Sequence, residues 1–169
     1  MQILGIVLVL VSSTMVGAYF GGIHGYRAKD LKEIKKALIV LKQEIEYTLT
    51  PLAQALLNTA AKVDKPASDI FAEAGGLIEQ KTVPNLALEK SLNNASAIGY
   101  LTKEDVQQLN SLGKTLGYLD KNLQLNTIDL TINYLQEKID EQIYLNNKNK
   151  KLYQTLGILG GILLVVILI

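Results

Sequence analysis

The side chains that most often do chemistry in proteins are scarce in this sequence. It has no cysteine and a single histidine, His24, so it offers no thiolate nucleophile, no cysteine-based metal site and no pair of imidazoles. His24 directly follows an apolar run and is far in sequence from candidate acids and nucleophiles. We interpret it as a polar residue at the boundary of that run, not as a catalyst or a ligand.

Two pairs of acidic residues remain as candidates for acid–base chemistry. Glu44 and Glu46 are two residues apart, which places them on different faces of a helix, and Asp140 and Glu141 are adjacent. Neither spacing brings two carboxylates to one site, so we interpret both pairs as solvated helix surface. The sequence also lacks a phosphate-binding loop and the HExxH, GxSxG and EF-hand patterns. It therefore predicts a protein that is not an enzyme and that binds no cofactor and no metal.

The distribution of charge divides the chain into three parts. Hydrophobic residues make up 49% of the 169 positions, and the excess lies at the two ends. All 17 basic and all 16 acidic side chains fall within residues 27–151, so this middle segment has the composition of an ordinary water-exposed domain. The net charge of +1 gives no reason to expect nucleic-acid binding.

Both ends of the chain are apolar runs without Lys, Arg, Asp or Glu, over residues 1–23 and 152–169. A helix rises about 1.5 Å per residue, so the second run covers roughly 27 Å, close to the roughly 30 Å of a hydrocarbon core. We predict two transmembrane helices, 1–26 and 152–169. A signal peptide is the alternative for the first run, although its first basic residue follows the apolar stretch instead of preceding it. A buried core helix is the alternative for the second.

Basic residues flank both predicted spans on the side of the middle segment. They are Arg27, Lys29, Lys32, Lys35 and Lys36 after the first span, and Lys148, Lys150 and Lys151 before the second. Because basic flanks stay on the cytoplasmic side, residues 27–151 are predicted to face the cytoplasm. Glycines within both apolar runs permit close helix packing, either between the two spans or in a homo-oligomer.

The middle segment has the three-four spacing of helices with one buried face. A first stripe consists of Leu31, Ile34, Leu38, Leu41 and Ile45, and a last one of Leu125, Ile128, Ile132, Leu135, Ile139 and Ile143. Shorter helices are expected over about 51–62, after Pro66, over about 86–97 and after Thr102. No stretch alternates with a period of two for long enough to predict a strand. We predict an all-α bundle of about six helices, in which the last is long and continues into the second span.

Several residues predict where these helices begin and where one is weak. Thr50 is expected to be the N-cap of the second helix, with Pro51 at its first position. Residues 102–105 have the spacing of a capping box, and Asp120 is expected to cap the long last helix. The adjacent glycines at 75 and 76 are expected to weaken the third helix.

A helical module of this kind functions through its surfaces. Two classes of function fit it: an assembly platform within a multi-protein membrane complex, and an adaptor or sensor that passes a signal between membrane and cytoplasm. An extended coiled-coil tether does not fit, because the heptads are interrupted by proline and glycine after two to three repeats.

Four segments of the chain resemble the stage III sporulation protein AB family of endospore-forming bacteria. They are residues 41–52, with the family pattern E-I-x-Y-x-x-T-P-L, residues 66–71, residues 113–124, and residues 148–152 with 156–161. The matching positions in the first and third segments are Glu44, Ile45, Tyr47, Thr50, Pro51, Leu52, Gly113, Leu116, Gly117, Asp120 and Gln124. The chain departs from the family at Leu88, where relatives tend to carry tryptophan, and at Leu119, where a small or polar residue is more usual.

The resemblance implies a fold, a location and a partner. The family's cytoplasmic part is similar to the helical domain of the inner-membrane platform proteins of type II secretion and type IV pilus machines. By this resemblance the protein would lie in the mother-cell membrane around the forespore, within the channel complex that late forespore gene expression needs. The implied cytoplasmic partner is a secretion-type ATPase, stage III sporulation protein AA.

Overall fold

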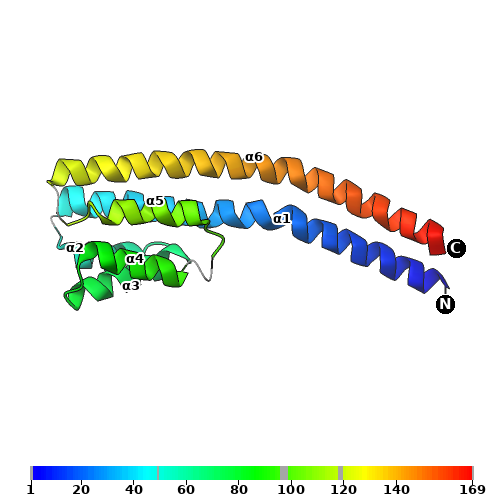
Figure 1. Cartoon of the computed structure of the whole chain (residues 1–169), viewed down its shortest axis with the longest axis horizontal. Coiled ribbons are helices and arrows are strands. Elements are labelled where there is room, and N and C mark those ends of the chain that lie inside the picture. Colours follow the sequence, from blue (N-terminus) through cyan, green and yellow to red (C-terminus); the bar gives the residue numbers. More distant parts are fainter. Residues whose placement is uncertain (1, 49, 96–98, 118–119, 169) are drawn as a thin grey trace. The chain divides into compact units, whose positions relative to one another are not determined.

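The computed structural model describes residues 2–48, 50–95, 99–117 and 120–168, and all regular secondary structure within these ranges is helical (Figure 1). The elements are α1 (Gln2–Gln43), the π-helix η1 (Glu44–Thr48), α2 (Leu52–Ala60), α3 (Ala67–Glu79), α4 (Pro84–Ala95), α5 (Lys103–Gly113) and α6 (Lys121–Leu168). The all-α class and the long last helix are thereby confirmed.

The chain forms two compact units. Residues 29–139 form one unit, and residues 1–28 together with 140–169 form the other. Helices α1 and α6 each contribute to both units. We call the unit of residues 29–139 the core unit.

Both predicted spans are helical, since α1 begins at Gln2 and α6 ends at Leu168. Among the residues that the structure describes, no helix is both long enough and apolar enough to cross a membrane. Most side chains of residues 1–26 and 152–169, including that of His24, lie outside the described residues. The two spans therefore remain predictions from the sequence.

The predicted apolar stripes form the centre of the core unit. In α1, the four leading stripe residues, Leu31, Ile34, Leu38 and Leu41, are all fully buried. In α6, the buried members are Ile128, Leu135 and Ile139. Side chains three, four and seven residues apart share one helix face, so the α1 stripe faces the interior from Leu31 to Leu41. In the α6 stripe, Leu125 and Ile132 are partly buried, and the prediction that Ile143 is buried is wrong, because this residue lies beyond the end of the core unit and is exposed. Full burial of one such side chain contributes about 1.5–3 kcal/mol, so these stripes account for much of the stability of the bundle.

Polar side chains fix α1 against α6. Lys42 Nζ donates to both carboxylate oxygens of Asp129 at 2.7 Å, and Lys35 Nζ donates to the side-chain oxygen of Gln136. The hydrogen bond to Asp129 raises the pKa of Lys42, so the lysine stays charged. Because the two pairs lie two turns apart on each helix, they fix the register of α1 along α6.

Backbone amides of two loops bind acidic side chains of α1. The N–H of Tyr100 donates to Asp30 Oδ2 at 2.8 Å, and the N–H of Asp64 donates to Glu33 Oε2 at 3.0 Å. Tyr100 lies in the connection between α4 and α5, and Asp64 lies in the connection between α2 and α3. Each loop is therefore held against the first helix by a hydrogen bond to a charged acceptor.

Of the N-caps predicted for α5 and α2, the structure contains the one at α5 and lacks the one at α2. The capping box of α5 is confirmed: Thr102 Oγ1 accepts from the Asp105 N–H at 3.3 Å, and Asp105 Oδ2 accepts from the Thr102 N–H at 2.8 Å. The prediction that Thr50 caps α2 is wrong. The N-cap position belongs to Pro51, which has no side-chain acceptor, and Thr50 lies one residue too early. Its hydroxyl instead forms a hydrogen bond with that of Thr48, at 2.6 Å.

The prediction that the glycine pair weakens α3 stays a prediction, since the helix bounds show only that the pair causes no break. Helix α3 runs through both residues without a break. Gly75 is buried, and a Cβ added to it would lie 2.9 Å from Leu57 Cγ and 3.0 Å from the backbone oxygen of Ala53. The absent side chain therefore lets α2 and α3 approach closely, which is the structural reason for a glycine at this position.

Candidate interaction site at the π-helical elbow

The chain reverses direction between α1 and α2 through η1 and the three residues that follow it. We call residues 44–52 the elbow. A π-helix widens the last turn of an α-helix by one residue, and such turns are frequent at functional sites. Here Thr48 Oγ1 donates to the backbone oxygen of Glu44, which satisfies a carbonyl at the end of the helix. The elbow is therefore a defined turn with its own hydrogen bonds.

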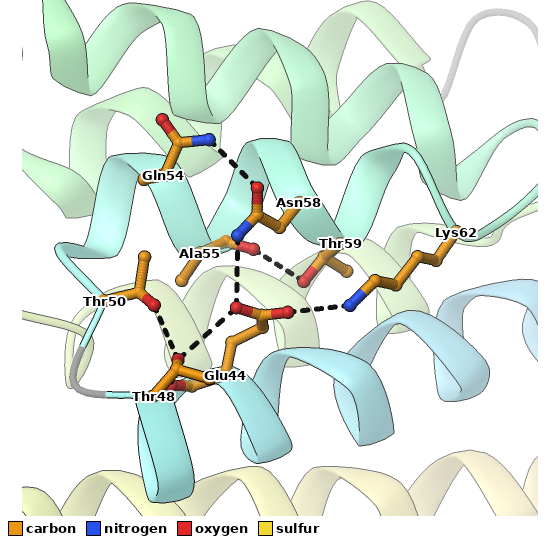
Figure 2. Close-up of polar contacts among 8 residues, drawn as sticks. All are labelled: Glu44, Thr48, Thr50, Gln54, Ala55, Asn58, Thr59 and Lys62. Carbon is orange, nitrogen blue, oxygen red and sulfur yellow. Dashed lines mark hydrogen bonds and ion pairs between the residues drawn. The ribbon is translucent and has the colours of Figure 1, made fainter.

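Glu44 is the centre of a polar cluster on the inner side of the elbow (Figure 2). Only 7% of its surface is exposed. Its Oε1 accepts from Lys62 Nζ at 2.8 Å, and its Oε2 accepts from Asn58 Nδ2 at 3.2 Å and from the Thr48 hydroxyl at 3.4 Å. Asn58 is in turn held by Gln54, whose Nε2 donates to Asn58 Oδ1 at 2.9 Å. One carboxylate thus connects η1 to the C-terminal end of α2 and to Lys62 just after it.

These contacts keep Glu44 ionised. The hydrogen bond from Lys62 is the main cause that lowers its pKa, the bond from Asn58 adds to it, and burial acts in the opposite direction. The interpretation of Glu44 as solvated surface is therefore wrong. Its partners lie 14 and 18 residues further along the chain, so they reach it only because the elbow turns α2 back toward it. Glu46, the other member of the pair, contributes only its backbone oxygen to the contacts described here.

The third family segment, residues 113–124, lies against the elbow. Gly117 has a φ of +82°, which favours glycine, and a Cβ added to it would lie 3.0 Å from Pro84 Cγ and 3.4 Å from Leu52 Cδ2. The Lys121 Nζ donates to the backbone oxygen of Glu46 at 2.6 Å. Two segments separated by more than 60 residues of sequence therefore meet at one end of the core unit.

The other described family positions of that third segment cap α6 or pack in the core. Asp120 caps α6: its Oδ1 accepts from the Asn122 N–H at 2.9 Å, and its backbone oxygen accepts from the Gln124 N–H at 3.1 Å. Leu116 is buried, and a Cβ on Gly113 would lie 3.0 Å from Leu88 Cδ2. Leu88 itself is a buried core residue, whereas Leu119 lies outside the described residues.

Among the described residues of the elbow, Tyr47 is the large apolar side chain that is left on the outer surface. Tyr47 is 75% exposed, whereas Ile45 and Leu52 pack against the core. Within the part of the chain that the structure describes, no three His, Cys, Asp or Glu side chains are grouped to hold a metal ion. The hydrogen-bonded residues of the elbow thus present an aromatic ring, a residue type enriched where proteins bind one another.

A sequence profile described as stage III sporulation protein AB matches residues 2–169. The chain belongs to the stage III sporulation protein AB family. The relative of that name from Bacillus subtilis (strain 168) is 28% identical over 169 residues, which is 99% of each chain. A solved structure of a stage III sporulation protein AB matches 72% of this chain and 96% of its own, with a TM-score of 0.66 and 27% identity. Family membership connects the chain to sporulation, and the family name denotes no enzymatic activity.

Proposed function

We propose that this member of the family is a membrane-anchored structural component of the sporulation channel complex, built to assemble other proteins on its cytoplasmic bundle. One observation carries the proposal. The two helices that supply the buried stripes of the core unit, α1 and α6, are the same two helices that extend into the uncharged apolar runs at the chain ends. A bundle carried by two such helices suits a platform held at a membrane surface.

The proposed topology places the bundle in the cytoplasm and both chain ends on the other side, within the mother-cell membrane around the forespore. Its support is the basic residues that flank each apolar run on the side of residues 27–151. The same topology gives the bundle access to a cytoplasmic ATPase. A signalling adaptor would share this topology and would differ from a platform in the proteins bound to it.

A cysteine placed at Lys90 tests this topology. Lys90 is exposed on α4, and the chain has no cysteine of its own, so the single thiol reports one position. In intact cells that produce the Lys90→Cys chain, we expect no labelling by a membrane-impermeant maleimide. After the membrane is opened with detergent, we expect full labelling. Rapid labelling of intact cells would place the bundle outside the cytoplasm and contradict the proposal.

We further propose that the elbow surface is where the complex's secretion-type ATPase, stage III sporulation protein AA, docks. The support is physical: Tyr47 projects 75% exposed from a turn that Glu44 and Thr48 hold in place. A tyrosine side chain has only two rotatable side-chain torsions, so it loses little conformational entropy on binding and can contribute strongly to an interface.

Replacement of this tyrosine tests the docking site. Tyr47→Ala should leave the fold unchanged, because the ring is mostly exposed, and should reduce ATPase recovery with a tagged chain by roughly tenfold or more, since hot-spot residues contribute about 2 kcal/mol or more. Tyr144→Ala, at a 67% exposed tyrosine outside the elbow, is the matched control. Recovery of the ATPase at the normal level with Tyr47→Ala would exclude the elbow as its docking site. Recovery of other membrane or signalling proteins in its place would favour the adaptor function.

A further inference from the structure

An open groove of about 760 Å³ lies over α5, and residues of α4, α5, α6 and the connection before α5 line it. This volume is within the roughly 300–1,000 Å³ that is usual for ligand sites. Every residue that lines the groove belongs to the core unit, and none belongs to the elbow. The groove is therefore a candidate site in its own right, separate from the site proposed for the ATPase.

Four polar side chains form a row along α5 within the groove. They are Lys103, Gln107, Asn110 and Lys114. Their spacings of four, three and four residues place them on one face of the helix. We call these four residues the polar row. Among the described residues, none of these side chains has a partner in a hydrogen bond or an ion pair. The row therefore offers two amides to a ligand, between two positive charges.

The charge of the polar row is not cancelled within the groove. Among the described residues that line it, Glu104 is the acidic one, and its Oε1 lies 3.3 Å from Lys138 Nζ on α6. Asp105 is fully buried, and its carboxylate is used in the capping box of α5. The two lysines of the row thus leave the groove with a net positive charge, which is complementary to an acidic ligand.

The separation of the two lysines indicates the length of that ligand. Lys103 and Lys114 are eleven residues apart in the sequence, which is roughly 16 Å along a helix. An extended chain covers about 3.3 Å per residue, so two acidic side chains about five residues apart would reach both lysines. A single small anion could reach only one of them at a time.

The amides between the lysines favour an extended ligand over a helical one. Asn110 Oδ1 is buried and accepts no hydrogen bond, which is unfavourable for a polar atom. A half-turn of this amide exchanges its oxygen with its nitrogen, so Asn110 can present either an acceptor or a donor to the groove. Gln107 has the same two groups. An extended main chain has free N–H and C=O groups to pair with these amides, whereas a helix has already bonded its own.

We propose that the polar row binds an extended acidic segment of another protein. Carboxylates of the segment pair with Lys103 and Lys114, and its main chain forms hydrogen bonds with the amides of Gln107 and Asn110. A tail or a linker can adopt this conformation, whereas a folded surface seldom can. Because the row contains no elbow residue, one chain can hold such a segment and a second partner at the same time.

A titration followed by nuclear magnetic resonance tests the proposal. The probe is the peptide Glu-Ser-Thr-Ser-Thr-Glu with blocked ends, added at low salt to the nitrogen-15-labelled full chain in a non-ionic detergent. We expect the largest shifts at the amides of α5 and at the side-chain amides of Gln107 and Asn110. The same peptide with glutamine at both ends should bind at least about fivefold more weakly, since each exposed ion pair strengthens binding by up to about fivefold.

Two double variants separate the polar row from general attraction by charge. Lys103→Gln with Lys114→Gln should weaken binding of the acidic peptide by at least about fivefold. Lys29→Gln with Lys32→Gln removes the same charge from exposed lysines of α1 and should leave the affinity unchanged. Equal loss in both variants, or equal binding of the acidic and neutral peptides, would overturn the proposal.

Two further probes distinguish other ligands from an extended acidic segment. A helical peptide with two glutamates eleven residues apart should bind more weakly than the extended probe, because its main chain cannot pair with the amides. Tighter binding of the helical peptide would overturn the extended conformation. Inorganic phosphate that produced the same shifts as the peptide, at equal or lower concentration, would identify a site for small anions and would also overturn the proposal.

Discussion

Gly75→Ala is expected to lower the free energy of unfolding by about 1–3 kcal/mol, although alanine is the better helix former. The new Cβ would lie 2.9 Å from Leu57 Cγ and 3.0 Å from the backbone oxygen of Ala53. The leucine can move by a small rotation, but the carbonyl belongs to α2, so α2 and α3 must separate to admit the methyl group. Urea unfolding of the full chain, followed by circular dichroism, measures the change.

The neighbouring glycine supplies the control for this prediction. A Cβ added to Gly76 meets no atom within 4 Å, so Gly76→Ala should raise the free energy of unfolding, by up to about 1 kcal/mol, through helix propensity alone. Both variants add one methyl group to α3, at adjacent positions, so only the surroundings of the new Cβ differ. If both stabilise the chain equally, the close approach of α2 and α3 at Gly75 does not limit their packing.

Glu44→Ala is the second substitution with a large expected effect. It removes the acceptor for Lys62, Asn58 and Thr48 together, and loss of a buried charged acceptor costs about 1.5–3 kcal/mol. Glu44→Gln keeps a hydrogen-bonding oxygen and loses the charge, so its cost should be smaller. Loosening of the elbow should also reduce ATPase recovery with Glu44→Ala, if Tyr47 docks the ATPase as proposed. Equal stability of the alanine variant and the wild type would show that the cluster contributes nothing to folding.

The charge of Glu44 makes part of this stability dependent on pH. The pKa of Glu44 is lower in the folded chain than its ordinary value of 4.5, so folding favours the ionised form. Its contribution is fully present above that ordinary value and is lost as the pH falls through the lower, folded-state value. The difference in unfolding free energy between wild type and Glu44→Gln should therefore be constant near neutral pH and shrink in acid. A difference that persists unchanged in strong acid would exclude ionisation as its source.

Much of the fold could be predicted from local patterns. The stripe of α1 and the capping box of α5 depend on residues within one or two helical turns, and both are confirmed. The cap formed by Asp120 on α6 is of the same kind, since Asp120 reaches an amide two residues away. Features that depend only on residues close together in the chain can therefore be predicted from the sequence.

The features that could not be predicted depend on contacts between distant segments. Glu44 looks like surface until the elbow brings Lys62 to it, and Gly75 looks like a defect until α2 packs against it. The N-cap of α2 is a separate case, since α2 begins at Leu52, so that Pro51 and not Thr50 directly precedes its first turn. Neither residues 41–52 nor residues 113–124, taken alone, predict that these two family segments approach each other at Gly117.

The pairing of α1 with α6 has a consequence for biosynthesis. Lys35 and Gln136 are 101 residues apart, so the ribosome must translate all the intervening helices before α1 acquires this partner. At about 5–20 residues per second, the delay is roughly 5–20 s. During that interval the buried cluster that α1 shares with α2–α5 lacks the side chains that α6 adds to it, which makes the nascent chain a candidate for chaperone binding. A ribosome that stalls before codon 128 would release a chain without the Ile128, Leu135 and Ile139 stripe, so quality control should recognise such fragments as unfolded.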